Sequence, residues 1–168
     1  MKRINQLFLL ILCACFFGAA INAQPKQDST KGGDARVEKA LKQTKTEYEV
    51  EKDGMYKVTL GTTGKRSQAA FIVSETDKIY GSEMRGVFSY AMISDDSPSP
   101  EITNLLLAQN MENVSFWAIQ KEKDGKFAII NIIYIPADAD GKKLDWALKN
   151  VILAADEMEE RLTKKDEF

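Results

Sequence analysis

The segment from Phe127 to Ile135, with the sequence FAIINIIYI, is the strongest constraint on the fold of this chain. Its residues are apolar at both odd and even positions, and Asn131 is its one strongly polar member. Successive side chains of a strand point to opposite faces of a sheet, so a strand made of this segment has two apolar faces. Such strands normally lie inside a sheet that is covered on both sides. We therefore predict a central strand, with Asn131 hydrogen-bonded to a neighbour or facing a sheet edge.

Turn signals predict two hairpins and further strands around this segment. Asp124-Gly125 and Asp53-Gly54 each separate two strand-like runs, and Asp-Gly favours the positive φ angles of a tight hairpin turn. The run from Lys78 to Gly86 has two glycines and mixed charge, which leaves the start of one strand open. The predicted strands are Tyr48–Glu51, Met55–Thr62, Gln68–Ser74, Val87–Ile93, Ser115–Lys121 and Lys126–Ile135.

Three segments have the periodicity of amphipathic helices. The first is Ala35–Thr46, with Asp34 as its N-cap. The second has Ser99 as its N-cap and Pro100 at its first position, and it ends near Asn110. The third runs from about Lys142 to Thr163 behind the loop PADADG, with Asp140 at or beside its N-cap. Its apolar stripe comprises Leu144, Ala147, Leu148, Val151, Ala155, Met158 and Leu162.

The first residues have the pattern of a secretory signal peptide. Lys2 and Arg3 precede an uncharged run from Leu7 to Ile21, which is shorter than the roughly 20 apolar residues of a membrane span. We predict a signal peptide at 1–23, cleaved between Ala23 and Gln24. The alternatives are an uncleaved anchor and a lipoprotein signal with Cys15 as the lipidated residue. A flexible linker (24–34), a single domain (35–163) and a charged, frayed tail (164–168) follow in the prediction.

Cleavage at Ala23 removes Cys13 and Cys15, and the chain contains no histidine. The exported part therefore lacks the residues of Ser-His-Asp and Cys-His catalysis and the His or thiolate ligands of zinc and copper sites. Loss of Lys2 and Arg3 leaves 21 basic and 25 acidic residues, a net charge of −4. A nucleic-acid interface would be basic, so we expect no nucleic-acid partner. We also expect no cofactor, no metal and, once the signal is cleaved, no membrane contact.

Several local patterns suggest sites, but each has a plainer structural interpretation. Gly61-Thr62-Thr63-Gly64-Lys65 lacks the spacing of a phosphate-binding loop and fits a β-turn better. Asp138, Asp140 and Asp145 do not match a calcium loop, which leaves at most a weak cation site. Asp156 and Glu160 share a helix face, although such acidic runs are usually solvated. The aromatic residues Tyr80, Phe88, Tyr90, Trp117 and Tyr134 suit either a binding surface or the core.

Five segments follow one another in a recognisable order: Tyr48–Gly54, Leu105–Asn110, Ser115–Ile119, Ile135–Asp138 and Ala154–Asp156. Their order resembles the YbjN family, whose fold is similar to that of the type III secretion chaperones. The resemblance covers about Ala35 to Leu162. It implies an α+β sandwich, in which helices pack on an antiparallel sheet in the order α-β-β-β-α-β-β-α. It also implies chaperone-like protein binding, often as a homodimer, in place of catalysis.

We therefore expect a periplasmic or secreted, non-catalytic module that binds a protein or peptide. An export signal does not suit a chaperone that works in the cytoplasm, so the fold is expected to serve a different role here. Two alternatives stay open. One is a hydrolase that uses paired carboxylates or a Ser-Lys pair, and the other is a structural dimerisation domain.

Overall fold

The computed structural model describes residues 32–168. The predicted signal peptide, its cleavage site at Ala23 and Gln24, and residues 24–31 of the predicted linker lie outside the described residues. The helices are α1 (Ala35–Thr44), α2 (Pro100–Gln109) and α3 (Gly141–Thr163). The strands are β1 (Glu49–Val50), β2 (Tyr56–Gly61), β3 (Ser67–Ile72), β4 (Asp77–Ile79), β5 (Ser82–Ser94), β6 (Phe116–Lys121) and β7 (Phe127–Pro136).

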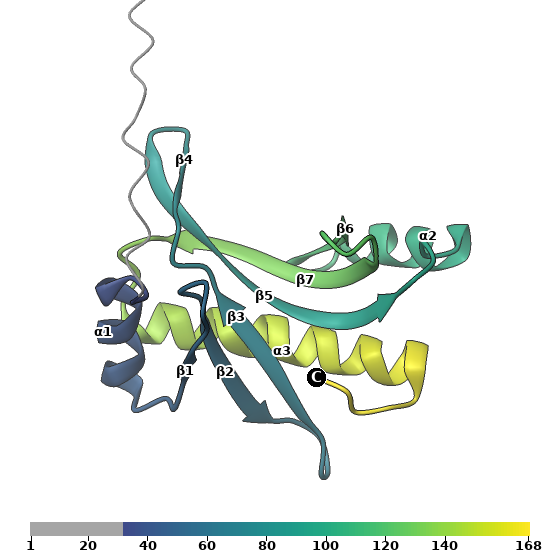
Figure 1. Ribbon diagram of the computed structural model, residues 1–168, viewed down its shortest axis with the longest axis horizontal. Coiled ribbons are helices and arrows are strands. Elements are labelled where there is room, and N and C mark those ends of the chain that lie inside the picture. The colour runs from purple at the N-terminus through teal and green to yellow at the C-terminus, as the bar shows by residue number, and fades with distance from the viewer. Residues whose placement is uncertain (1–31) are drawn as a thin grey trace, which may run out of the picture.

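The strands form one antiparallel sheet of seven strands (Figure 1). The strand order is β1-β2-β3-β5-β7-β6, and β4 pairs with β5 beside this path. Helix α3 runs along one face of the sheet, and the apolar residues of α1 and α2 join it there. The predicted α+β class, with helices packed on an antiparallel sheet, is confirmed. We call the face that carries α3 the inner face and the opposite one the outer face.

The helices begin where side-chain caps were predicted. Asp34 accepts the N–H of Arg36 at the start of α1, and Ser99 accepts that of Ile102 at the start of α2. Asp140 accepts the N–H of Lys143 at the start of α3. Each cap satisfies one of the N–H groups that the first turn of a helix leaves without a partner.

The hairpin of β4 and β5 was not predicted from the sequence. Ile79 pairs with Ser82 across a two-residue turn, in which Tyr80 has a φ of 49° and Gly81 a φ of 82°. Such a turn needs positive φ at both central residues, and Asn, Asp or Gly normally supplies the first of them. Tyrosine at that position is a weak turn signal, so β5 begins earlier than the predicted Val87.

Strand β7 lies between β5 and β6, which confirms its predicted place inside the sheet. Its inner side chains, among them Ile129 and Ile133, belong to the core beneath the helices. The predicted cover of its second face is found only in part. On the outer face Ala128 and Ile130 are buried, whereas Ile132 is half-buried and Tyr134 is 42% exposed. None of the helices within residues 32–168 packs on this face.

A short polar row divides the core on the inner face. One apolar cluster joins α1 and the first half of α3 to the sheet, and another joins α2 and the second half of α3 to it. Between the two lie Gln68, Ser89 and Asn131, all with 0% exposure. The Gln68 Nε2 donates to Ser89 Oγ at 3.1 Å, and Ser89 Oγ donates to the Ala69 carbonyl oxygen at 2.6 Å.

Asn131 departs from its predicted environment, because it neither faces a sheet edge nor bonds to a neighbour. Its Nδ2 and Oδ1 atoms have no hydrogen-bond partner among residues 32–168. A buried polar group without a partner costs about 1–3 kcal/mol. We therefore expect Asn131→Val to raise the free energy of unfolding by about 1–2 kcal/mol, measured by urea denaturation.

The matched control for this substitution is Ser89→Ala, on the strand that pairs with Asn131. The Ser89 hydroxyl is fully bonded, so its removal is expected to lower the free energy of unfolding by about 1 kcal/mol. A loss of stability in Asn131→Val as large as that in Ser89→Ala would contradict the assignment of Asn131 as an unbonded amide.

Candidate functional site

The outer face presents a continuous apolar surface built from side chains of neighbouring strands. The paired residues Phe71, Phe88, Ile132 and Phe116 form one row across β3, β5, β7 and β6. Directly paired residues point to the same side of a sheet, so the row lies on one face. Lys57 of β2 pairs with Phe71 and extends the row with a basic side chain.

Aromatic contacts hold this surface together. The rings of Phe71 and Phe88 are stacked with 5.4 Å between their centroids, and Tyr90 contacts both of them edge-on. Phe116 and Tyr134 stack at 6.0 Å, and their exposed fractions are 39% and 42%. Stacked and edge-on pairs favour rigid rings with defined positions. The outer face is therefore a shaped aromatic surface that solvent reaches.

The five aromatic residues singled out from the sequence are divided between three places. Phe88, Tyr90 and Tyr134 lie on the outer face. Trp117 lies in the core of the inner face, where its Nε1 donates to Gln109 Oε1 at 2.8 Å. Tyr80 stands fully exposed at the β4–β5 turn. Phe71 and Phe116 were missed, because only the strand register brings them beside Phe88 and Tyr134.

Asp156 and Glu160 do not form a carboxylate pair, and the solvated face that was expected for this acidic run is wrong for Asp156. Glu160 points to solvent, whereas Asp156 and Glu159 are buried with 3% and 0% exposure. Arg66 bridges them: its Nε lies 2.7 Å from Asp156 Oδ1 and its Nη2 lies 3.0 Å from Glu159 Oε2. Burial raises the pKa of Glu159, and the N–H of Glu167 and the charge of Arg66 oppose this rise.

These acids, together with the exposed Asp166, are also close enough to hold a metal ion. The guanidinium of Arg66 already supplies a positive charge between Asp156 and Glu159. We therefore interpret this cluster as a structural ion pair. The predicted acids Asp138, Asp140 and Asp145 are not part of this group. Asp140 caps α3, and Asp145 pairs with Lys149 at 2.7 Å on the same helix.

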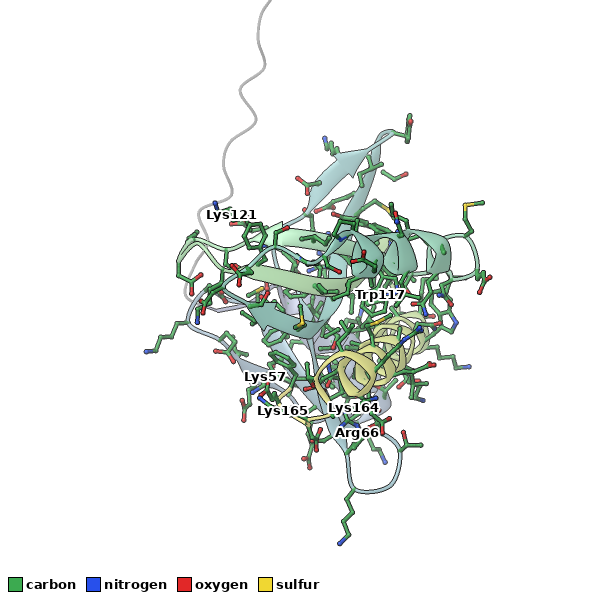
Figure 2. The ribbon with its side chains drawn as sticks, turned by 90° about the vertical axis from the view of Figure 1, so that its right-hand side faces the viewer. Lys57, Arg66, Trp117, Lys121, Lys164 and Lys165 are labelled. Carbon is green, nitrogen blue, oxygen red and sulfur yellow. The ribbon has the colours of Figure 1, made fainter. Side chains whose placement is uncertain are left out.

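The segment Gly61–Lys65 forms the predicted turn. Thr62 and Arg66 close it with a backbone hydrogen bond of 2.9 Å, and Gly64 adopts a φ of 69°. The turn joins β2 to β3 and places Arg66 beside the end of α3 (Figure 2). Its role is therefore to position Arg66.

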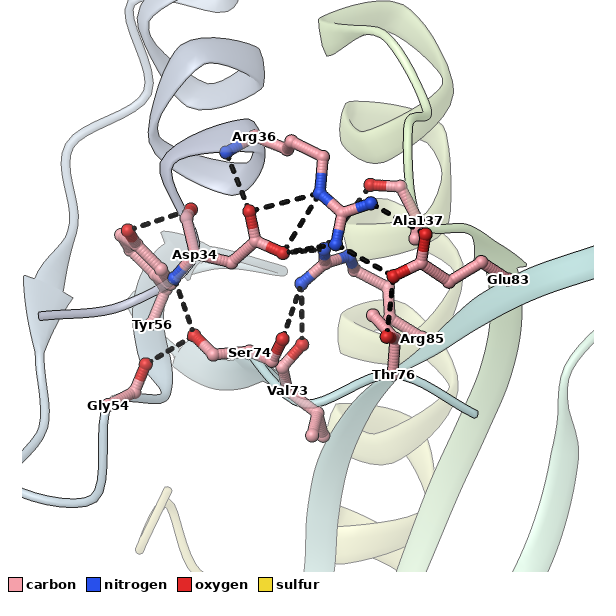
Figure 3. A network of polar contacts seen from close by, with 10 residues as sticks. All are labelled: Asp34, Arg36, Gly54, Tyr56, Val73, Ser74, Thr76, Glu83, Arg85 and Ala137. Atoms are coloured by element: carbon pink, nitrogen blue, oxygen red, sulfur yellow. Dashed lines mark hydrogen bonds and ion pairs between the residues drawn. The ribbon is translucent and has the colours of Figure 1, made fainter. Parts of the chain in front are cut away.

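A second polar network surrounds Arg85 at the other end of α3 (Figure 3). Arg85 is 2% exposed and donates to Asp34 and to the carbonyl oxygens of Val73, Ser74 and Ala137. The network thereby ties the start of α1 to β5 and to the loops that follow β3 and β7. It also shows that the end of the predicted linker, at Asp34, belongs to the folded domain.

The charges in this network balance. Burial alone would raise the pKa of Asp34, but hydrogen bonds from Arg36 and Arg85 hold it well below its ordinary value of 3.8. The hydrogen bond from Arg36, helped by Thr76, lowers the pKa of Glu83 to about 2. The guanidinium groups of Arg36 and Arg85 thus neutralise the carboxylates of Asp34 and Glu83. The network therefore has a structural role, because none of these four charges is left unpaired to bind a ligand.

Comparison with protein-family models, curated proteins and solved structures finds no match for this chain. The resemblance to the YbjN family therefore stays a prediction. In the described part of the chain, no helix combines the length and the apolar character needed to cross a bilayer.

Proposed function

We propose that this protein is an exported, non-catalytic module that binds extended apolar segments of other polypeptides on its outer face, in a chaperone-like manner. The observation that carries the proposal is the aromatic row from Phe71 to Phe116, which no helix within residues 32–168 covers. An exposed apolar surface of this kind marks an interaction site more often than a surface without a role.

The surface has the features that protein recognition uses. Its aromatic side chains supply large contact areas and lose little conformational freedom on binding. The rings are already fixed by one another, as the 5.4 Å stack of Phe71 on Phe88 shows. Lys57 lies at one end of the row, where it can meet an acidic partner residue. The export signal predicted at 1–23 favours a site of action in the periplasm or outside the cell.

The proposal is tested with a fluorescein-labelled, reduced and carboxymethylated protein, which stays unfolded and exposes apolar segments. Fluorescence anisotropy of the labelled protein gives its Kd for the module. We expect the double variant Phe71→Ser/Phe88→Ser to weaken binding about tenfold or more, because interface aromatics each contribute about 1–2 kcal/mol or more.

The matched control is Leu107→Ser on α2. Leu107 is 59% exposed and lies away from the outer face, so this variant should bind within about twofold of the parent chain. Equal losses in both variants, or no binding by the parent chain, would overturn the proposal. Light scattering provides a further check. If the parent chain is a dimer and the double variant is a monomer, the outer face serves self-association, and the proposal is overturned.

A further inference from the structure

Strands β3 and β5 separate partway along their length and leave a seam in the sheet. They pair only at Ala70–Ile72 of β3 and Val87–Ser89 of β5. The preceding residues of β3, Ser67–Ala69, still pair with β2 on their other side. Their second edge is therefore not paired with the backbone of β5, although the Ser89 hydroxyl of β5 donates to the Ala69 carbonyl oxygen. The N–H of Ala69 stays available at this edge, next to the aromatic row.

Residues 164–168, for which a frayed tail is predicted, fold back into this seam (Figure 1). Lys164 ends α3 with a φ of 60°, which reverses the chain. The N–H of Ala69 then donates to the Phe168 backbone oxygen at 2.8 Å, and Arg66 Nη1 donates to the Lys165 carbonyl oxygen at 2.6 Å. The tail is thus held at the edge of β3 by one backbone hydrogen bond, while the N–H of Glu167 donates to Glu159 Oε1 at 2.6 Å.

Two side chains of the tail find partners on the domain. The Phe168 ring stacks on Tyr90 with 5.9 Å between centroids, and so extends the aromatic cluster of the outer face. The Asp166 Oδ1 accepts the N–H of Ser67 at 3.4 Å, close to Arg66. The seam therefore holds an acidic residue two positions before an aromatic one, through the N–H of Ser67, the N–H of Ala69 and the ring of Tyr90.

We infer that the seam is the specific peptide-binding site of the module, and that residues 164–168 are a built-in competitor for it. This inference rests on the proposed function and names its partner class. The partner is an extended segment of another protein with an acidic residue two positions before an aromatic residue. Such a segment adds to the β3 edge, places its ring on Tyr90 and its carboxylate at Ser67 and Arg66.

The tethered tail reduces the affinity of the full chain for such ligands. A segment joined by a short linker competes at an effective concentration in the millimolar range. A free peptide must displace it, and a chain that lacks residues 165–168 has no such competitor. Removal of the tail should therefore strengthen binding of the peptide, because it frees the N–H of Ala69 and the ring of Tyr90.

The test uses a fluorescein-labelled peptide with the sequence of residues 160–168, ERLTKKDEF. We expect the chain that ends at Lys164 to bind it at least tenfold more tightly than the full chain, by anisotropy. The full-length variant Phe168→Ser keeps the backbone of the tail and should show the same direction of change. A control peptide with alanine in place of the aspartate and the phenylalanine should bind neither form.

The outcomes separate this inference from the proposed function. If the unfolded carboxymethylated protein binds all forms but the peptide binds none, the inference is overturned and the proposed function stands. If the unfolded protein fails to bind as well, both fall. A full-length dimer that is lost in the chain ending at Lys164 would show that tails exchange between copies, and would also overturn the inference.

Discussion

Replacing Arg85 by methionine is expected to lower the free energy of unfolding by about 3–5 kcal/mol, as measured by urea denaturation at pH 7. Arg85 is 2% exposed, and its guanidinium satisfies Asp34 and three carbonyl oxygens at once. Methionine fills a similar volume but donates no hydrogen bond. The partly buried carboxylate of Asp34 then loses one of its two cations, and the carbonyl oxygens lose their donor.

The control is Arg36→Ala in the same network. The side chain of Arg36 is 37% exposed, so water replaces much of what it provides, and a loss of about 1 kcal/mol is expected. Equal losses in the two variants would show that burial does not govern this network.

The pH dependence of the Arg85 effect follows from Asp34. Its pKa in the folded state is depressed, so the stability it contributes is present above its ordinary value of 3.8 and is lost as the pH falls through the folded pKa. The gap between the parent chain and Arg85→Met should therefore be smaller at pH 3 than at pH 7. A gap that stays constant with pH would assign the whole effect to the carbonyl oxygens.

Replacing Arg66 by alanine is expected to cost about 3 kcal/mol of unfolding free energy at pH 8. The variant leaves Asp156 and Glu159 side by side, buried, without the guanidinium that bridges them. Adding Glu159→Gln should recover much of the loss, because the double variant no longer buries two unpaired charges. The adjacent Lys65 is exposed, so Lys65→Ala serves as the control and should stay within about 0.5 kcal/mol of the parent.

The pH dependence of the Arg66 effect has a different origin from that of the Arg85 effect. The pKa of Asp34 is lowered, whereas burial raises the pKa of Glu159. A carboxyl whose folded pKa is raised favours the folded state when protonated, and costs stability as the pH rises through its ordinary value of 4.5. Removal of Arg66 takes away an opposing charge and raises this pKa further. The cost of Arg66→Ala should therefore be smaller at pH 5 than at pH 8, and the addition of Glu159→Gln should remove this difference.

Local rules predicted the parts of the fold that depend on neighbouring residues. Asp34, Ser99 and Asp140 cap the helices because each has an N–H of the first helical turn within reach. The two apolar faces of Phe127–Ile135 correctly placed β7 inside the sheet. The same pattern predicted that both faces of β7 are covered. Apolar residues that pack against a helix and apolar residues on an uncovered sheet face have the same sequence pattern, so the sequence does not distinguish them.

The contacts that define the site depend on residues far apart in the chain. Asp34 meets Arg85 across 51 positions, and Arg66 meets Asp156 across 90. In neither pair does the sequence around one residue indicate which distant residue it contacts. The tail was predicted to fray because Lys164–Glu167 is charged, and its binding site appears only where β3 and β5 diverge. Strand register, which sequence periodicity does not specify, decides which aromatic residues share the outer face.

The polar row of Gln68, Ser89 and Asn131 also bears on how the domain opens. It divides the core into two clusters that share only α3 and the central strands. Units of this kind exchange their amide hydrogens through separate partial openings. The cluster around Trp117 holds α2 and β6, at the edge of the sheet, and β6 carries Phe116 of the outer face. One end of the aromatic surface thus belongs to the smaller cooperative unit, which can adjust to a partner while the end near Phe71 keeps its shape.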